Sequence, residues 1–262
     1  MGKLQPRFKV SAALRIDPLL NDYSSTYLKL QQWGYDVDET LNDKSLLEIQ
    51  RFISEWIDKM KALYVAVSLP NSFVFPDESV RSQLISKAIV PVCKEKNIPF
   101  SMMIGVKRGV NPALKSAGDG IGKANIDSVE KICKMYPQNK FLVTMLSREN
   151  QHELTVNARK FRNLMVFGCW WFLNNPSLIE EITKMRFELL GLSVIPQHSD
   201  ARILDQLVYK WDHSREIITN VLTKKYEDLI KADWDIHRVD IERDISKLFG
   251  GNFWIFLKKE LQ

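Results

Sequence analysis

The stretch Phe141-Leu142-Val143-Thr144-Met145-Leu146-Ser147-Arg148-Glu149-Asn150-Gln151-His152-Glu153 contains one complete transition from strand to helix. Phe141–Leu146 is apolar almost without interruption, which is typical of a strand buried on both faces of a parallel sheet. Polar and charged residues follow it, and helical spacing begins at Gln151. The stretch therefore predicts one βα unit with polar side chains at the carboxyl end of its strand.

The same pattern recurs along the whole chain. Apolar runs that predict strands are Val10–Ile16, Leu63–Leu69, Phe100–Val106, Phe141–Leu146, Leu164–Phe172 and Leu192–Ile195. Amphipathic spacing predicts helices at Ser45–Lys61, Arg81–Lys96, Asp127–Tyr136, Gln151–Phe161, Asn175–Leu190 and Arg215–Ala232. Ser45 and Glu48 predict a capping box, and Asn175 before Pro176 predicts an N-cap.

Consecutive βα units imply right-handed crossovers, and these leave either a doubly wound sheet or a (β/α) barrel. The loops that lead from a strand to a helix are longer than those that lead from a helix back to a strand. They hold most of the unusual polar residues, as a barrel requires. The α/β chain is therefore predicted to be of the (β/α)8 TIM-barrel type but incomplete, because no further strand is evident after Asp200. Residues 1–262 are expected to form a single partial barrel domain, with a C-terminal helical extension from about 213 to 262.

Composition excludes several function classes. Lysine and arginine number 37 against 32 acidic residues, a formal net charge of +5, but they are interleaved with the acidic residues. A nucleic-acid partner is not expected, because it would need a basic stripe. The positive balance suits an anionic small substrate, although solubility explains it equally well. Cys93, Cys133 and Cys169 stand far apart, which predicts reduced, structural thiols.

No membrane association is expected either. The longest apolar run, Leu164–Leu173, is too short for a membrane helix. Residues 1–15 show no charged region followed by an apolar one, so a cytoplasmic location is the expectation.

The run Ile195-Pro196-Gln197-His198-Ser199-Asp200-Ala201-Arg202 delivers polar side chains directly after a strand. Asp200 could ligate a metal or accept a proton, or it could be the N-cap of a helix that begins near Ala201. Arg202 could hold a carboxylate with its bidentate fork, or form a surface ion pair. His198 could be an acid, a base or a ligand, and no spaced partner chooses between these roles.

Two further runs end in candidate site residues. Trp170 and Trp171 close an apolar run, so on a strand one of them points away from the other. One could line a sugar pocket, or both could simply pack in the barrel. The run Ser147–Glu153 could bring Arg148 and His152 to the same face, although a solvated helix start explains it almost as well. Gly118–Lys123 is rejected as a phosphate loop, because Ala124 stands where the motif requires serine or threonine.

Several long runs together resemble the uronate isomerase (glucuronate isomerase) family, whose fold is an amidohydrolase-type barrel. The runs that carry the resemblance are Ala12–Leu20, Phe141–Glu153, Gly168–Phe172 and Pro196–Arg202. The resemblance implies an aldose–ketose isomerase that interconverts D-glucuronate with D-fructuronate, and D-galacturonate with D-tagaturonate. It also implies a divalent metal, zinc, as cofactor.

The resemblance assigns roles to residues of this chain. Asp200 matches the carboxylate that binds the metal or acts as a base, and Arg202 and Arg15 match arginines that hold the substrate. The remaining matches are substrate-pocket positions, at Trp170, Trp171, His152 and His198.

One departure from the family pattern stands out. The family's first strand carries a His-x-His pair for the metal, and this chain has no such pair. Its strands would correspond to the third through eighth of the family barrel. Two alternatives to an active isomerase therefore stay open: an inactive fragment that binds sugar acids weakly, or one that pairs with a complementing N-terminal segment or with itself. Hydrolysis by an amidohydrolase-type site is a poorer third alternative, since it needs the same histidines.

Overall fold

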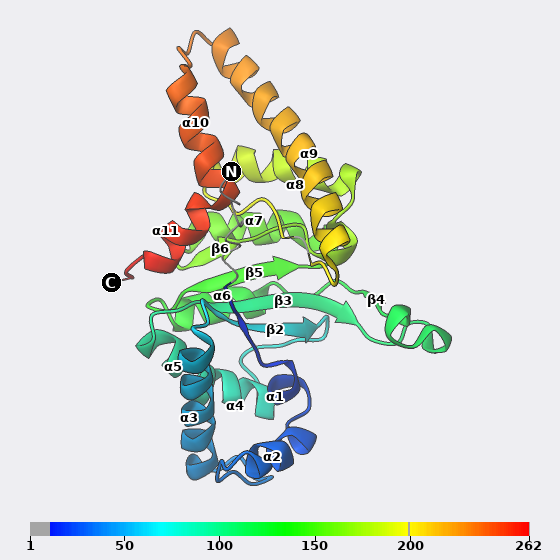
Figure 1. Cartoon of the computed structure of the whole chain (residues 1–262), viewed down its shortest axis with the longest axis vertical. Helices are drawn as coiled ribbons and strands as arrows, with labels where there is room; N and C mark the ends of the chain where they lie inside the picture. Colours follow the sequence, from blue (N-terminus) through cyan, green and yellow to red (C-terminus); the bar gives the residue numbers. More distant parts are fainter. Residues whose placement is uncertain (1–10, 199, 262) are drawn as a thin grey trace, which may run out of the picture.

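The computed structural model describes residues 11–198 and 200–261 and places a parallel sheet at the centre of the molecule (Figure 1). The strands are β1 (Leu14–Arg15), β2 (Val65–Pro70), β3 (Phe100–Lys107), β4 (Gly120–Ile121), β5 (Phe141–Met145) and β6 (Leu164–Val166). The helices are α1 (Asp17–Asn21), α2 (Tyr23–Gln32), α3 (Asp43–Met60), α4 (Val80–Leu84), α5 (Val90–Glu95), α6 (Asp127–Met135), α7 (Gln151–Lys160), α8 (Pro176–Leu190), α9 (Leu204–Lys231), α10 (Arg238–Ser246) and α11 (Asn252–Lys258).

The strands follow one another across the sheet in chain order. The order is β1-β2-β3-β5-β6, all parallel, and an isolated parallel bridge from Phe167 to Ile195 extends it by one position. A doubly wound sheet would reverse direction part-way, whereas a barrel wall does not. The sheet is therefore consistent with part of a (β/α) barrel. The short strand β4 pairs antiparallel with β3 and was not predicted from the sequence.

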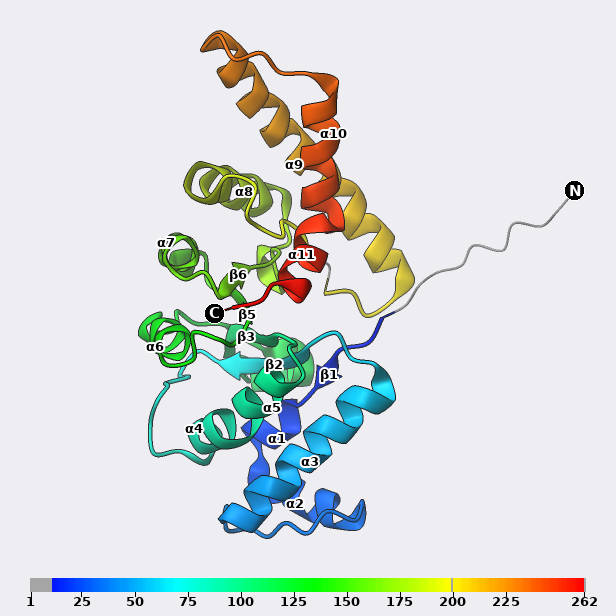
Figure 2. The ribbon, with the colours of Figure 1, turned by 90° about the vertical axis from the view of Figure 1, so that its left-hand side faces the viewer.

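Neighbouring residues of β2 and β3 enter different cores. Val65, Val67 and Leu69 of β2 pack in the main core, which also contains the apolar faces of the surrounding helices. Ala66 and Met103 belong to a separate, smaller core on the other face of the sheet. Figure 2 shows α4, α6, α7 and α8 on one side of the strands and α11 on the other. The small second core thus lies on the face of the sheet opposite α4, α6, α7 and α8, called here the inner face.

Most of the predicted strands and helices are confirmed, with shifted ends. The predicted strand Leu164–Phe172 ends at Val166, because Gly168 has a φ of 60° and turns the chain. The predicted helix at Arg215 instead begins at Leu204. Val10, the predicted start of the first strand, lies outside the described residues. Asn175 caps α8 as predicted, since its Oδ1 accepts a hydrogen bond from Leu178 N at 3.2 Å.

The predicted capping box at Ser45 is wrong. Asn42 is the N-cap of α3, and its side chain accepts from Ser45 N at 2.8 Å. Glu48 instead accepts from the backbone N–H of Asp36 at 2.9 Å and from Arg51. Glu48 therefore ties the preceding loop to the helix rather than capping it.

The predicted helix Arg81–Lys96 is interrupted by a π-helical turn at Ile85–Ile89. Pro91 lies just beyond and has no N–H to donate to the carbonyl of Lys87. Gln50 of α3 supplies the missing donor, with Nε2 2.7 Å from Lys87 O. The contact fastens α3 to the interrupted helix.

The C-terminal helices first project from the body of the molecule, and the last of them lies against the sheet. Helices α9 and α10 form an arm that projects from the body, and α11 lies back against the sheet (Figures 1 and 2). Lys140 donates to Leu257 O, and Lys259 donates to Arg162 O at 2.6 Å. Across the described residues, no helix is long and apolar enough to cross a membrane. The three cysteines are free and buried, as expected for structural thiols.

Candidate functional site

A cavity of about 570 Å³ opens at the carboxyl ends of the strands. Its walls come from segments that are far apart in the sequence but that end at the same edge of the sheet. The lining includes five of the predicted site residues, Arg15, Trp170, Trp171, Asp200 and Arg202. Ser68, Val106, Arg108, Ala117, Asp119, Phe172, Gln206 and Lys210 complete it.

Arg15 is fixed at one side of the cavity by a pairing with Asp17. Its Nε and Nη2 donate to the two carboxylate oxygens of Asp17, each at 2.8 Å, and Nη2 also reaches Ser68 Oγ at 3.0 Å. The hydrogen bond to Asp17 raises the pKa of Arg15 above its ordinary value. Burial opposes ionisation of Asp17, but the hydrogen bonds from Arg15 and from Ser68 N lower its pKa overall. The pair is thus charged and rigid.

Asp200 lines the same cavity, in a backbone conformation with φ of 42°. The alternative role as an N-cap is wrong, because α9 begins at Leu204 with Ile203 at its N-cap position. Lys210 Nζ donates to the Asp200 carbonyl at 2.9 Å. Arg202 N donates to Gln206 Oε1 at 3.0 Å. The guanidinium of Arg202 forms no ion pair with any described residue, so the surface-pair alternative finds no support.

The two tryptophans do not lie on a strand, so the expectation that one points away from the other is wrong. Trp170 precedes a 3-10 turn, Trp171–Leu173, and both indoles line the cavity. Their ring centroids are 6.0 Å apart, and Trp171 stacks on Phe172 at 4.6 Å. Trp170 is also buried in the small inner core. It therefore serves both as core and as pocket wall.

Two cations of the cavity were missed by sequence reasoning. Arg108 follows β3 directly and pairs with Asp119, whose carboxylate also accepts from Gly109 N at 3.0 Å. Because Arg108 comes just after a predicted strand, the sequence could have identified it as a candidate site residue. Lys210 lies within α9 and carried no such signal, because the start of that helix was predicted too late.

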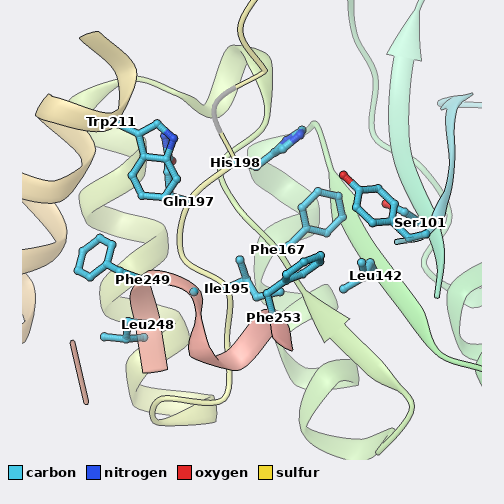
Figure 3. A pocket seen from close by; sticks show the side chains of 12 residues that line it. Ser101, Leu142, Phe167, Ile195, Gln197, His198, Trp211, Leu248, Phe249 and Phe253 are labelled. Carbon is cyan, nitrogen blue, oxygen red and sulfur yellow. The ribbon is translucent and has the colours of Figure 1, made fainter. Parts of the chain in front are cut away.

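His198 is not among the residues that line this cavity. It lines a second, mainly apolar cavity of about 290 Å³ between the sheet and residues 248–253. Figure 3 shows it beside the ring of Phe167, and the ring centroids are 5.1 Å apart. Burial lowers the pKa of His198 to about 4, and its buried Nδ1 has no hydrogen-bond partner among the described residues. The imidazole is therefore neutral near pH 7.

His152 is exposed on the first turn of α7 and is not among the lining residues of either cavity. Arg148 pairs with Glu181 of α8, with Nη2 2.9 Å from Oε1. The structure therefore brings neither side chain to Asp200.

The described residues do not by themselves make a metal site. Within residues 11–198 and 200–261, no three histidine, cysteine or acidic side chains are grouped as metal ligands. Asp200 offers one carboxylate, and zinc sites need at least three protein ligands. No reaction step of this chain is therefore assigned to a metal.

Comparison with solved structures finds uronate isomerases. A uronate isomerase from Bacillus halodurans is 55% identical, with a TM-score of 0.94, and the match covers 98% of this chain and 61% of that one. A uronate isomerase from Thermotoga maritima is 15% identical (TM-score 0.78, 93% of this chain and 60% of that one). A glucuronate isomerase from Caulobacter crescentus is 13% identical (TM-score 0.73, 94% and 58%).

At the two lower identities the likeness shows the fold alone. A scan against protein-family models finds no match, and a search of curated proteins finds none either. The matches with the three solved structures cover less than two thirds of the length of each of those proteins.

Proposed function

This chain resembles the C-terminal part of a uronate isomerase over 98% of its length, and from that resemblance we propose that its larger cavity binds a sugar acid for aldose–ketose isomerisation. The substrates proposed are D-glucuronate with D-fructuronate, and D-galacturonate with D-tagaturonate. The observation that carries the proposal is the charge pattern of the cavity.

Two of the four cations around the cavity already have a carboxylate partner. Arg15 pairs with Asp17, and Arg108 pairs with Asp119. The remaining charged residues of the lining are the cations Arg202 and Lys210 and the anion Asp200, which leaves an excess of one positive charge. A single carboxylate group matches that excess, and a guanidinium binds it in bidentate fashion. The pattern favours a monoanionic sugar acid over a neutral sugar.

The remaining walls suit the sugar ring and its hydroxyls. Trp170 and Trp171 provide aromatic faces, and Ser68 provides a hydroxyl. By resemblance, Arg202 and Arg15 hold the substrate, and Asp200 accepts a proton or contributes one ligand to a divalent metal, zinc. Isomerisation moves a proton between C2 and C1 of the open-chain sugar. The roles of His152 and His198 in substrate binding stay predictions.

The partial barrel is proposed to need a complementing polypeptide for turnover. By resemblance its strands are equivalent to the third through eighth of the family barrel. The smaller cavity lies on the inner face of the sheet. The start of α9 also exposes apolar residues, including Leu204 and Val208. A complementing segment would cover such surfaces and supply further metal ligands. A cytoplasmic location also stays a prediction.

An inactive fragment that binds sugar acids is the second candidate. The absence of a three-ligand group among the described residues favours it for this chain alone. Both candidates share the same cavity, so one experiment with two readouts separates them.

The experiment combines calorimetric binding with an assay of turnover. We expect D-glucuronate to bind saturably, and Arg202→Met to weaken binding about tenfold, or about 1.4 kcal/mol. D-glucose serves as the neutral control ligand. Turnover with added zinc is expected only after the remaining part of the Bacillus halodurans enzyme is supplied as a separate chain. Equal affinity for D-glucose and D-glucuronate would refute the sugar-acid site, and binding without rescued turnover would support the inactive fragment.

A further inference from the structure

The backbone at Asp200 adopts an uncommon conformation. Its φ of 42° lies in the left-handed region, which only a few per cent of residues other than glycine adopt, although aspartate adopts it more often than most. Asp200 also lies outside any helix or strand, so no regular hydrogen-bond ladder holds it. Such backbone conformations persist when neighbouring groups fix them, and they are common at functional sites.

Lys210 supplies such a group from the neighbouring helix. Its Nζ donates to the Asp200 carbonyl at 2.9 Å, across ten residues of chain. Its own backbone carbonyl accepts from Gln197 Nε2 at 3.3 Å. One residue of α9 therefore holds both ends of the site segment, defined here as Gln197, His198 and Asp200.

The other side of the site segment is packed against Gly168. A Cβ added to Gly168 would lie 2.5 Å from His198 N and 2.8 Å from His198 Cα, far inside contact distance. The carbonyl of Gly168 is held in turn by the fully buried Arg186, whose Nη1 lies 2.8 Å away. The site segment is thus held between the Gly168 backbone and Lys210. Of these two residues, Lys210 carries a charge and lines the cavity.

We infer that Lys210 is a positioning residue, whose ammonium fixes the backbone of Asp200 and so directs the Asp200 carboxylate into the cavity. Lys210 lines the same cavity and has no carboxylate partner among the described residues. Removing the ammonium frees Asp200 to leave the left-handed region. The consequence for ligand binding rests on the proposed function, but the positioning itself does not.

The first test reads the backbone directly. The ¹³Cα and ¹³Cβ chemical shifts of Asp200, which depend on its φ and ψ, are measured by NMR in the wild type, Lys210→Met and Lys210→Arg. We expect both shifts to depart from the wild-type values in Lys210→Met and to stay close to them in Lys210→Arg, which keeps a charged donor for the Asp200 carbonyl. Lys224→Met, at an exposed position of the same helix, is the matched control and should match the wild type. If Lys210→Met does not fold, Lys210→Gln replaces it with the same expectation.

The second test reads binding of D-glucuronate by calorimetry in the same variants. We expect Lys210→Met to lose about tenfold in affinity and Lys210→Arg to retain most of it. Unchanged Asp200 shifts in Lys210→Met overturn the inference whatever the ligand does. Changed shifts in a protein that binds no D-glucuronate support the positioning role and refute the proposed function, so the two failures are distinguishable.

Discussion

Gly168 leaves no room for a side chain of its own. Its φ is 60°, and its missing side chain leaves the room that His198 occupies. Gly168→Ala is therefore expected to cost about 1–2 kcal/mol for the left-handed backbone and about 1–3 kcal/mol more for overpacking. Urea unfolding monitored by circular dichroism measures the sum.

Gly109→Ala is the matched control for that prediction. Gly109 has a nearly equal φ of 61°, but nothing lies within 4 Å of an added Cβ. It should show the backbone cost alone, about 1–2 kcal/mol. Equal losses for the two substitutions would mean that the contact with His198 adds nothing.

At the scale of single residues, the sequence singles out a side chain best where it follows a recognised strand. Asp200 and Arg202 were found in this way and Arg15 through the family resemblance, and all three line one cavity. Their roles stay predictions. Lys210 and Gly168 act through a backbone carbonyl and through empty space, and neither interaction leaves a pattern in the sequence. His152 follows β5 in the same way but projects from the exposed side of α7.

Helix α3 is joined to the loop before it by a charged cluster around Glu48. The carboxylate accepts from Arg51 and from Asp36 N, and these hydrogen bonds lower its pKa to about 2. Glu48→Gln is expected to lower the free energy of unfolding by about 1 kcal/mol at pH 7. Glu242→Gln removes a more exposed ion pair with Arg238 and should have a smaller effect.

The same cluster predicts a pH dependence with a definite sign. Because the folded pKa of Glu48 is below its ordinary value of 4.5, the unfolded state binds more protons between these two pH values. The stabilisation is present above about pH 4.5 and is lost as the pH falls towards about 2. The difference between wild type and Glu48→Gln should therefore shrink across that window in thermal melts. A constant difference would assign the loss to packing instead of charge.

At the scale of helices and strands, periodicity predicted the elements but not their ends. The apolar spacing of α3 was visible, but the choice of Asn42 over Ser45 as its N-cap depends on where the loop arrives. The start of α9 was predicted too late, since its first turns expose apolar residues and lack a core-facing stripe. The turn at Gly168 was missed because the apolar run continues through it.

For the whole molecule, the chain order of the strands across the sheet agrees with the predicted partial barrel. The sequence could not show how the C-terminal segment lies. Residues 248–253 return to the inner face of the sheet and form one wall of the smaller cavity. This placement depends on long-range contacts, such as Lys140 with Leu257, that have no local pattern.

The first turns of α9 expose an apolar surface, defined here by Ile203, Leu204, Val208 and Tyr209. Exposed apolar patches of this kind promote association with another protein surface. We therefore expect the isolated chain to self-associate with increasing concentration in sedimentation velocity. Val208→Glu should shift the distribution towards monomer, because it places a charge in the contact.

Ile230→Glu is the matched control on the same helix, since Ile230 is 56% exposed and Val208 is 71% exposed. It lies at the far end of α9 and should leave self-association unchanged. If the part of the Bacillus halodurans uronate isomerase that this chain does not match is supplied as a separate chain, it should compete for the same surface, so that its addition reverses self-association of the wild type. A wild type that stays monomeric at all concentrations would contradict the role given to this surface, and equal effects of the two substitutions would assign association to net charge.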